Sequence, residues 1–272
     1  MRTLARSGLP FMKMHGLGND FVVIDGRAGA VEADSEILSA MADRRRGIGF
    51  DQLVIIGPSE EGGDFHLSFW NSDGSRSATC GNATRCVAAQ MMNRTGQDML
   101  RMTTERGILH ALRRPDGEVA VNLGHPDTHW RDIPLSEEVD SLHLPIEGDP
   151  VATGMGNPHC TFFVEDVSAI DLATFGPSIE HHPLFPERTN VQIAQVLDHG
   201  RIRMRVWERG AGITEASGSS SCAVTVAAAR RGLTGRQVTI ELDGGELEIR
   251  WSDDGVWMKG PAAHVYDGVW YG

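Results

Sequence analysis

Two short stretches decide the fold: Gly16-Leu17-Gly18-Asn19 near the start of the chain, and Gly154-Met155-Gly156-Asn157, whose asparagine follows 138 residues after the first. An apolar, strand-like run comes directly after each, Phe21–Ile24 in the first case and Cys160–Val164 in the second. A repeat at a fixed spacing indicates a duplicated architecture, so the two halves of the chain can be compared outward from these points.

Four further matches keep the same order at a spacing of 137 or 138 residues. In chain order the matched pairs are Asp51–Ile55 with Thr189–Ile193, Phe69–Asn71 with Val206–Glu208, Cys80–Asn82 with Ser217–Ser219, and Asp116-Gly117 with Asp254-Gly255. The sequence therefore predicts two similar domains that arose by duplication and face each other. Their predicted extents are 1–124, joined by 264–272, and 125–263.

Each half contains the same predicted elements. Apolar, β-branched stretches are bounded by Gly, Asn and Asp, with hairpin signals at Pro115-Asp116-Gly117 and Asp243-Gly244-Gly245. One helix stands out per half, over Ala83–Arg94 and over Ala223–Arg231, and a glycine follows closely on each. We predict an α+β fold in which each domain is a mostly antiparallel sheet around one central helix.

Composition excludes several functional classes. The chain has 272 residues, 40% of them hydrophobic, and a net charge of −12 with no basic run, so we expect no nucleic-acid partner. Apolar stretches such as Val226–Ala229 are too short to cross a bilayer, and the first residues lack a signal-peptide core, so we expect a cytoplasmic protein without a membrane partner. No C-x-x-C pair or histidine cluster has zinc spacing, and we expect no metal.

A segment of small residues leads into each predicted helix, Cys80-Gly81-Asn82 in the first half and Ser217-Gly218-Ser219 in the second. Unpaired backbone N–H groups and the helix dipole make such a start an anion site, and two of them facing one cleft would grip a carboxylate from both sides. A cysteine there has a lowered pKa and serves as a thiolate. Taken alone, Cys80 also fits a small buried residue beside a capping glycine, but the duplicated context favours function.

At these residues the chain resembles the diaminopimelate epimerase family. The motifs are MKMHGLGNDFVVID (12–25), NSDGS with CGNATRC (71–86), GMGNPHC (154–160) and WERGAGI (207–213), and the resemblance covers essentially the whole chain. It implies interconversion of LL- and meso-diaminopimelate, on the route to lysine and peptidoglycan, by a homodimeric enzyme with neither pyridoxal phosphate nor metal. It also implies two thiols on opposite faces of the α-carbon that act as base and acid.

The resemblance also implies roles for individual residues. Cys80 matches the first catalytic thiol, and His159 and Glu208 match groups that tune the pKa values of the thiols. Four positions match residues whose backbone binds the reacting carboxylate: Gly81, Asn82, Gly218 and Ser219. Those that match residues holding the two ends of the substrate are Asn19, Gln52, Asn71, Asn157, Asn190, Glu208 and Arg209. Singly, the asparagines also fit turns, and Glu208-Arg209 fits a surface ion pair.

Ser217 departs from the family pattern, because it stands where the second thiol is expected. A hydroxyl delivers a proton but is a poor base unless another group activates it. Three explanations remain open: a replacement made for crystallography to stop a facing cysteine pair from oxidising, a natural Cys/Ser pair helped by Glu208 or His159, or a changed substrate. The last would resemble proline racemases and hydroxyproline dehydratases. A binding-only protein with an impaired site is a further alternative.

The other cysteines receive separate interpretations. Cys86 and Cys222 lie within the predicted helices and are assigned to core packing, whereas Cys160 stays unassigned. Cys222 does not replace the missing thiol, because five residues along a helix add about 7.5 Å of rise and turn the side chain to another face.

Overall fold

A computed structural model describes residues 8–29, 31, 34–59 and 62–272. The chain divides into two compact units, one of residues 1–121 with 261–272 and one of residues 122–260. The observed boundaries, after residues 121 and 260, lie three residues before the predicted ones, after residues 124 and 263. The predicted boundaries stay predictions of where the two duplicated segments join. None of the helices in the described ranges is long and apolar enough to cross a membrane.

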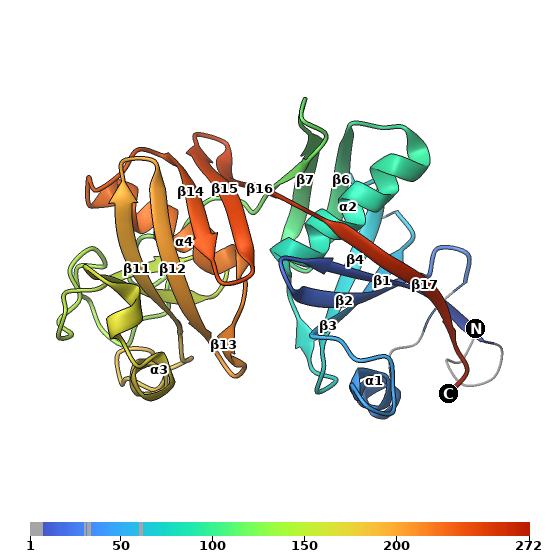
Figure 1. Cartoon of the computed structure of the whole chain (residues 1–272), viewed down its shortest axis with the longest axis horizontal. Coiled ribbons are helices and arrows are strands. Elements are labelled where there is room, and N and C mark those ends of the chain that lie inside the picture. Colours follow the sequence, from blue (N-terminus) through green and yellow to red (C-terminus); the bar gives the residue numbers. More distant parts are fainter. Residues whose placement is uncertain (1–7, 30, 32–33, 60–61) are drawn as a thin grey trace. The chain divides into compact units, whose positions relative to one another are not determined.

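The first unit is a curled mixed sheet with two helices (Figure 1). Its elements are β1 (Leu9–Gly16), β2 (Asn19–Asp25), α1 (Ser35–Ala42), β3 (Gln52–Gly57), β4 (Phe65–Asn71), β5 (Arg76–Ser77), α2 (Gly81–Thr95), β6 (Met99–Thr104), β7 (Gly107–Arg113), β8 (Val119–Asn122), which leads into the second unit, and β17 (Ala263–Trp270). Most neighbouring strands run antiparallel, but β2 pairs with β3, and β4 with β6, in parallel.

The second unit repeats this topology. Its elements are β9 (Val151–Gly154), β10 (Pro158–Phe163), a 3₁₀ turn η1 (Val167–Ala169), α3 (Leu172–Glu180), β11 (Asn190–Asp198), β12 (Arg201–Glu208), β13 (Gly212–Thr214), α4 (Gly218–Arg230), β14 (Gln237–Leu242), β15 (Gly245–Ser252) and β16 (Gly255–Gly260). The parallel pairs are again the second with the third strand, β10 with β11, and β12 with β14. The predicted α+β fold with its repeated design is confirmed.

Each central helix is packed deep inside its own unit. In α4 every residue from Ser220 to Ala228 is buried, because strands β9, β10, β11, β14, β15 and β16 all contact this helix. Helix α2 buries Asn82–Ala88 and ends at Gly96, whose φ of +73° is a left-handed cap that favours glycine. Burial on most sides fits the small, apolar composition that predicted these helices.

The structure differs from the sequence prediction in two helical details. Helix α4 begins at Gly218, five residues before the predicted start at Ala223, because the serine-rich entry is itself the first turn. Each unit also has a second, shorter helix, α1 or α3, that was not predicted. Helix α3 contains Gly176-Pro177, which is typical of a loop, and tertiary packing stabilises it: Gly176 lies so close to Trp207 that a Cβ there would meet the indole ring at 2.5 Å.

Candidate active site

Cys80 is the residue immediately before helix α2 and caps its N-terminus. The backbone of Cys80 is extended (φ −146°, ψ 112°), and its Sγ accepts a hydrogen bond from the backbone N–H of Ala83 at 3.5 Å. Gly81 and Asn82 follow as the first helical residues, and the Cys80 side chain is half-buried. A helix N-terminus favours the thiolate form of a sulfur that accepts its N–H groups, and the role of Cys80 as a catalytic thiolate stays a prediction.

A chain of hydrogen bonds fixes two of the predicted substrate-binding amides. Arg85, which is fully buried, donates to Asn82 Oδ1 at 2.9 Å and to the carbonyl oxygen of Pro261 at 3.1 and 3.2 Å. Asn82 Nδ2 donates to Asn19 Oδ1 at 3.3 Å, and Asn19 Nδ2 donates to Asp51 Oδ2 at 2.9 Å. Arginine only donates and a carboxylate only accepts, so the orientation of both amides is determined.

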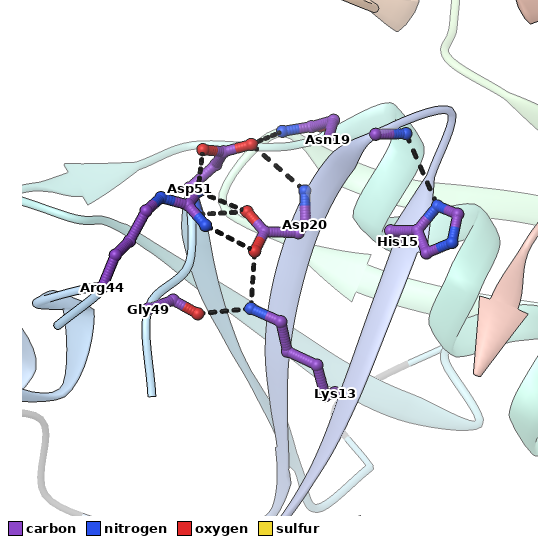
Figure 2. Close-up of polar contacts among 8 residues, drawn as sticks. Lys13, His15, Asn19, Asp20, Arg44, Gly49 and Asp51 are labelled. Carbon is purple, nitrogen blue, oxygen red and sulfur yellow. Dashed lines mark hydrogen bonds and ion pairs between the residues drawn. The ribbon is translucent and has the colours of Figure 1, made fainter. Parts of the chain in front are cut away.

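An ionic cluster supports this chain at the ends of β2 and β3 (Figure 2). Arg44 lies between Asp20 and Asp51, with nitrogen–oxygen distances of 2.7 Å to each carboxylate, and Lys13 reaches Asp20 at 2.5 Å. The Asp51 carboxylate also accepts from the backbone N–H of Asp20 at 3.1 Å. Burial by itself would raise the pKa of the Asp20 carboxyl, but hydrogen bonds from Arg44 and Lys13 outweigh it and lower the pKa to about 2.

The strand register brings Gln52 and Asn71 together. They lie opposite each other in β3 and β4, and Gln52 Nε2 donates to Asn71 Oδ1 at 3.0 Å. Asn71 Nδ2 in turn donates to Ser75 Oγ at 3.0 Å. The nearby Asn19 lies at the end of a tight hairpin in which Leu17 and Gly18 both have positive φ, the geometry of a two-residue turn between antiparallel strands.

Ser217 occupies in α4 the place that Cys80 occupies in α2. Its backbone is also extended (φ −138°, ψ 115°), but its side chain makes no capping bond to a described backbone N–H. Instead, Ser217 Oγ lies 2.8 Å from Glu208 Oε2 and 2.9 Å from Ser220 Oγ. Thr214 Oγ1 donates to the other carboxylate oxygen of Glu208 at 2.6 Å. Gly218 and Ser219 lie in the first turn of the helix.

His159 is buried beside this group. Its Nδ1 lies 3.0 Å from Gln192 Nε2 and 3.5 Å from Ser220 Oγ, and its Nε2 lies 2.9 Å from Asn157 Oδ1. Since the amide Nε2 of Gln192 only donates, Nδ1 accepts and the ring proton of the neutral imidazole is on Nε2, toward Asn157. The structure therefore brings together Asn157, His159, Glu208 and Ser217, all of which the sequence singled out.

Asn190 and Arg209 form a separate contact at the ends of β11 and β12. Asn190 Oδ1 accepts from the backbone N–H of Arg209 at 3.0 Å, and its Nδ2 donates to the Pro158 carbonyl at 2.9 Å. The buried carboxylate of Glu180 holds the same segment, accepting from Trp207 Nε1 at 2.6 Å and from the Gly210 N–H at 3.0 Å. Glu208 and Arg209 are thus fixed from both sides.

Sequence reasoning missed several residues that hold this site in place. They are Arg85, Asp51, Ser220, Gln192 and Glu180. A signal existed for two of them: Arg85 is a lone charge among the small residues of a helix, and Ser220 stands three residues after Ser217, which puts it on the same helical face. Glu180 and Gln192 act through tertiary contacts that no local pattern reveals.

The remaining three cysteines are core residues. Cys86, Cys160 and Cys222 have no exposed surface. Burial raises the pKa of the Cys86 thiol to about 11 and raises that of the Cys160 thiol further. Cys160, which the sequence left unassigned, packs in the apolar core of the second unit. Within the described ranges, no group of three or more His, Cys, Asp or Glu side chains is arranged to hold a metal ion.

Solved structures share this fold. A hydroxyproline epimerase from Agrobacterium vitis matches with a TM-score of 0.71 over 96% of this chain and 92% of that one, at 11% identity. A PhzF-family phenazine biosynthesis protein from Bacillus anthracis matches with a TM-score of 0.68 over 97% of this chain and 99% of that one, at 14% identity. The fold is therefore that of the structural class to which these epimerase and PhzF structures belong.

Sequence comparison identifies the family within this class. The family model for diaminopimelate epimerase matches residues 11–129 and 151–265. The diaminopimelate epimerase of Rhodospirillum centenum is 50% identical over 264 residues, covering 95% of this chain and 91% of that protein, and that of Acidiphilium cryptum is 48% identical over 265 residues, covering 95% of each. The chain belongs to the diaminopimelate epimerase family.

Asp20 makes stability depend on pH at the acid end. Its pKa is lowered in the folded state from an ordinary 3.8 to about 2, so its stabilising effect is present above pH 3.8 and is lost as the pH falls toward 2. We expect the free energy of unfolding of the native chain to fall over this window by on the order of 1–2 kcal/mol more than that of Asp20→Asn, measured by urea denaturation. The exposed Asp253→Asn serves as control, and parallel curves for native chain and Asp20→Asn would contradict the assignment.

Cys80 should be the reactive thiol. We expect an alkylating reagent to modify Cys80 at least about tenfold faster than Cys86, Cys160 or Cys222, because Cys80 is partly exposed at a helix start while the others are buried. Peptide mass spectrometry measures the rates, and diaminopimelate should protect Cys80. Equal labelling of all four cysteines, or labelling that ignores the ligand, would count against a catalytic role.

Proposed function

We propose that this chain is a cofactor-independent isomerase that interconverts LL- and meso-diaminopimelate, a step toward lysine and peptidoglycan. The observation that carries the proposal is the pair of matched helix starts, Cys80 in α2 and Ser217 in α4, in a member of the diaminopimelate epimerase family. In this proposal the two residues serve opposite faces of the substrate α-carbon.

The α-hydrogen of an amino acid is a very weak acid, so its removal requires that the charge developing on the carboxylate be met by fixed donors. Backbone N–H groups at a helix start are such donors, and they need no reorganisation during the reaction. We assign this role to the first turns of α2 and α4, that is, to Gly81 and Asn82 in one and to Gly218 and Ser219 in the other.

The substrate has a second carboxylate and two amino groups, which require recognition of their own. We assign Arg209 to the distal carboxylate, because a guanidinium binds a carboxylate through two parallel hydrogen bonds. The other residues assigned to the ends of the substrate are Asn19, Gln52, Asn71, Asn157, Asn190 and Glu208. Their support is the rigid hydrogen bonding described above, which orients the amides before a ligand arrives.

His159 and Glu208 are assigned to tuning the proton affinity of the second acid–base group. Glu208 contacts the Ser217 hydroxyl directly, and His159 reaches it through Ser220. The alternatives of a proline racemase-like or hydroxyproline dehydratase-like enzyme have less support. A probable proline racemase and a hydroxyproline epimerase share the fold at 12% and 11% identity, whereas the epimerases of this family reach 50%. A binding-only protein would leave the α-hydrogen untouched, which the isotope experiment below tests.

We also propose that the enzyme is a homodimer formed along β17. Strand β17 pairs with β1 along one edge, and we propose that its other edge pairs with the same strand of a second copy. Val265, Val269 and Tyr271 alternate along this strand and its end, and their exposed fractions of 46–77% are large for apolar side chains. An exposed apolar edge of this length suits a second copy of the same strand.

A charge on this edge should separate the subunits. We expect light scattering after size exclusion to give the mass of two chains for the native protein and a shift toward one chain for Val269→Asp. Ile108→Asp is the matched control, because Ile108 is equally exposed but lies in β7. A native protein with the mass of one chain would overturn the proposed dimer.

The hydroxyl at position 217 should make the enzyme asymmetric. In deuterated water we expect the isomer whose α-hydrogen faces Cys80 to exchange it, and the isomer that faces Ser217 to exchange at least about 10²-fold more slowly, because a thiolate is a far better base than a hydroxyl. Net conversion should be weak in both directions and should rise in Ser217→Cys. Mass spectrometry of pure LL- and meso-diaminopimelate measures both rates, and rapid, equal exchange of both isomers would overturn this prediction.

A further inference from the structure

Four buried or half-buried side chains form a continuous hydrogen-bonded chain that ends at Glu208. Gln192 Nε2 lies 3.0 Å from Ser220 Oγ, Ser220 Oγ lies 2.9 Å from Ser217 Oγ, and Ser217 Oγ lies 2.8 Å from Glu208 Oε2. Gln192, Ser220 and Ser217 are at most 3% exposed. All of these residues belong to the second unit.

The chemistry of its two ends determines the direction of this chain. The amide nitrogen of Gln192 only donates, and Thr161 Oγ1, which donates to Gln192 Oε1 at 3.1 Å, holds the amide in that orientation. A carboxylate only accepts, so the Ser217 hydrogen points to Glu208. Ser217 has one hydroxyl hydrogen, and the contact between the two serines therefore uses the hydrogen of Ser220. Every hydrogen in the chain is directed toward Glu208.

We propose that Glu208 is the terminal proton acceptor and donor for the substrate face served by Ser217, and that Ser217 passes the proton on. When this face acts as base, the Cα–H bond breaks and its electron pair stays on the substrate. The proton goes to Ser217 Oγ while the hydroxyl proton of Ser217 moves to Glu208 Oε2. In the other direction Glu208 returns its proton to Ser217 Oγ, and Ser217 gives its own to the α-carbon.

This relay reduces, without removing, the disadvantage of a serine as a base. An isolated serine alkoxide is far too basic to form at neutral pH, but here the hydroxyl gains one proton as it loses another, so no alkoxide forms. Ser217 donates to Glu208 Oε2 at 2.8 Å, and Thr214 donates to the other carboxylate oxygen at 2.6 Å, which holds the carboxylate in place for this transfer. His159 is less well placed, since its Nδ1 accepts from Gln192 and lies 3.5 Å from Ser220.

Ser220 is a positioning residue in this proposal. Its hydrogen bond to Ser217 Oγ occupies one lone pair of that oxygen and leaves the Ser217 hydrogen committed to Glu208. The inference rests on the proposed epimerase function and assigns Glu208 a part in proton transfer beyond holding the substrate or tuning its neighbours.

A double-mutant cycle tests the relay. Glu208→Gln is made in the native chain and in Ser217→Cys, and deuterium incorporation into LL- and meso-diaminopimelate is followed by mass spectrometry. In the native background we expect Glu208→Gln to slow exchange of the Ser217-facing isomer at least about 10²-fold more than it slows exchange of the Cys80-facing isomer, because any loss of substrate binding affects both isomers. In Ser217→Cys the same replacement should slow exchange of that isomer by less than about tenfold, because a thiolate is a base by itself.

A purely substrate-binding or structural role for Glu208 predicts a different pattern. Exchange of both isomers would then fall together, and by equal factors in the two backgrounds, which would overturn the relay. Continued exchange from the Cys80 face serves as the internal control that Glu208→Gln folds and binds substrate. Absence of exchange from either isomer, even in Ser217→Cys, overturns the proposed function itself and the relay with it.

Two further measurements address Ser220 and the nature of the base. Ser220→Ala should slow exchange at the Ser217 face severalfold and leave the Cys80 face unchanged. The matched control is Ser221→Ala, since Ser221 Oγ donates to the Ser217 backbone carbonyl at 2.8 Å and takes no part in the hydrogen bonds between Gln192 and Glu208.

The pH profile at the Ser217 face should follow a carboxyl ionisation in the native protein and a thiol ionisation in Ser217→Cys. A thiol-like profile in both overturns the relay.

Discussion

The burial of the two central helices is the constraint on which the rest of the structure depends. Helices α2 and α4 lie against several strands of their own units, so neither can shift or rotate without disrupting a core. Their first turns are therefore fixed in place, and Cys80 and Ser217 are fixed with them. In each unit a residue with an extended backbone stands immediately before the central helix.

Polar side chains around these helix starts form chains whose direction is forced. In the first unit the chain runs from Arg85 through Asn82 and Asn19 to Asp51. In the second it runs from Gln192 through the serines to Glu208. Each begins at a group that only donates and ends at a carboxylate that only accepts, so no side chain between them has a second orientation of equal energy. Such ordering prepares a site before the ligand arrives.

The two chains differ in what they do to the residue at the helix start. Cys80 receives a backbone N–H at its sulfur, which favours the thiolate. Ser217 instead turns toward the Glu208 carboxylate, to which its hydroxyl donates. The two units thus differ in the side chain at the helix start, while their parallel strand pairs match.

The sequence by itself determined the repeated α+β design, the two central helices and the small-residue segments that begin them, because hydrophobic periodicity, glycine caps and a fixed spacing are local signals. It also singled out Cys80, His159, Glu208 and Ser217 through the family resemblance. The sequence did not predict helices α1 and α3. In α3, Gly176-Pro177 is typical of a loop, and close packing against Trp207 accompanies the helix there. The tertiary structure alone decided that Ser220 and Gln192 join Ser217 to His159 and Glu208, and that Arg85 orients Asn82 and, through it, Asn19, because these contacts connect residues from different strands and helices whose register no local pattern specifies.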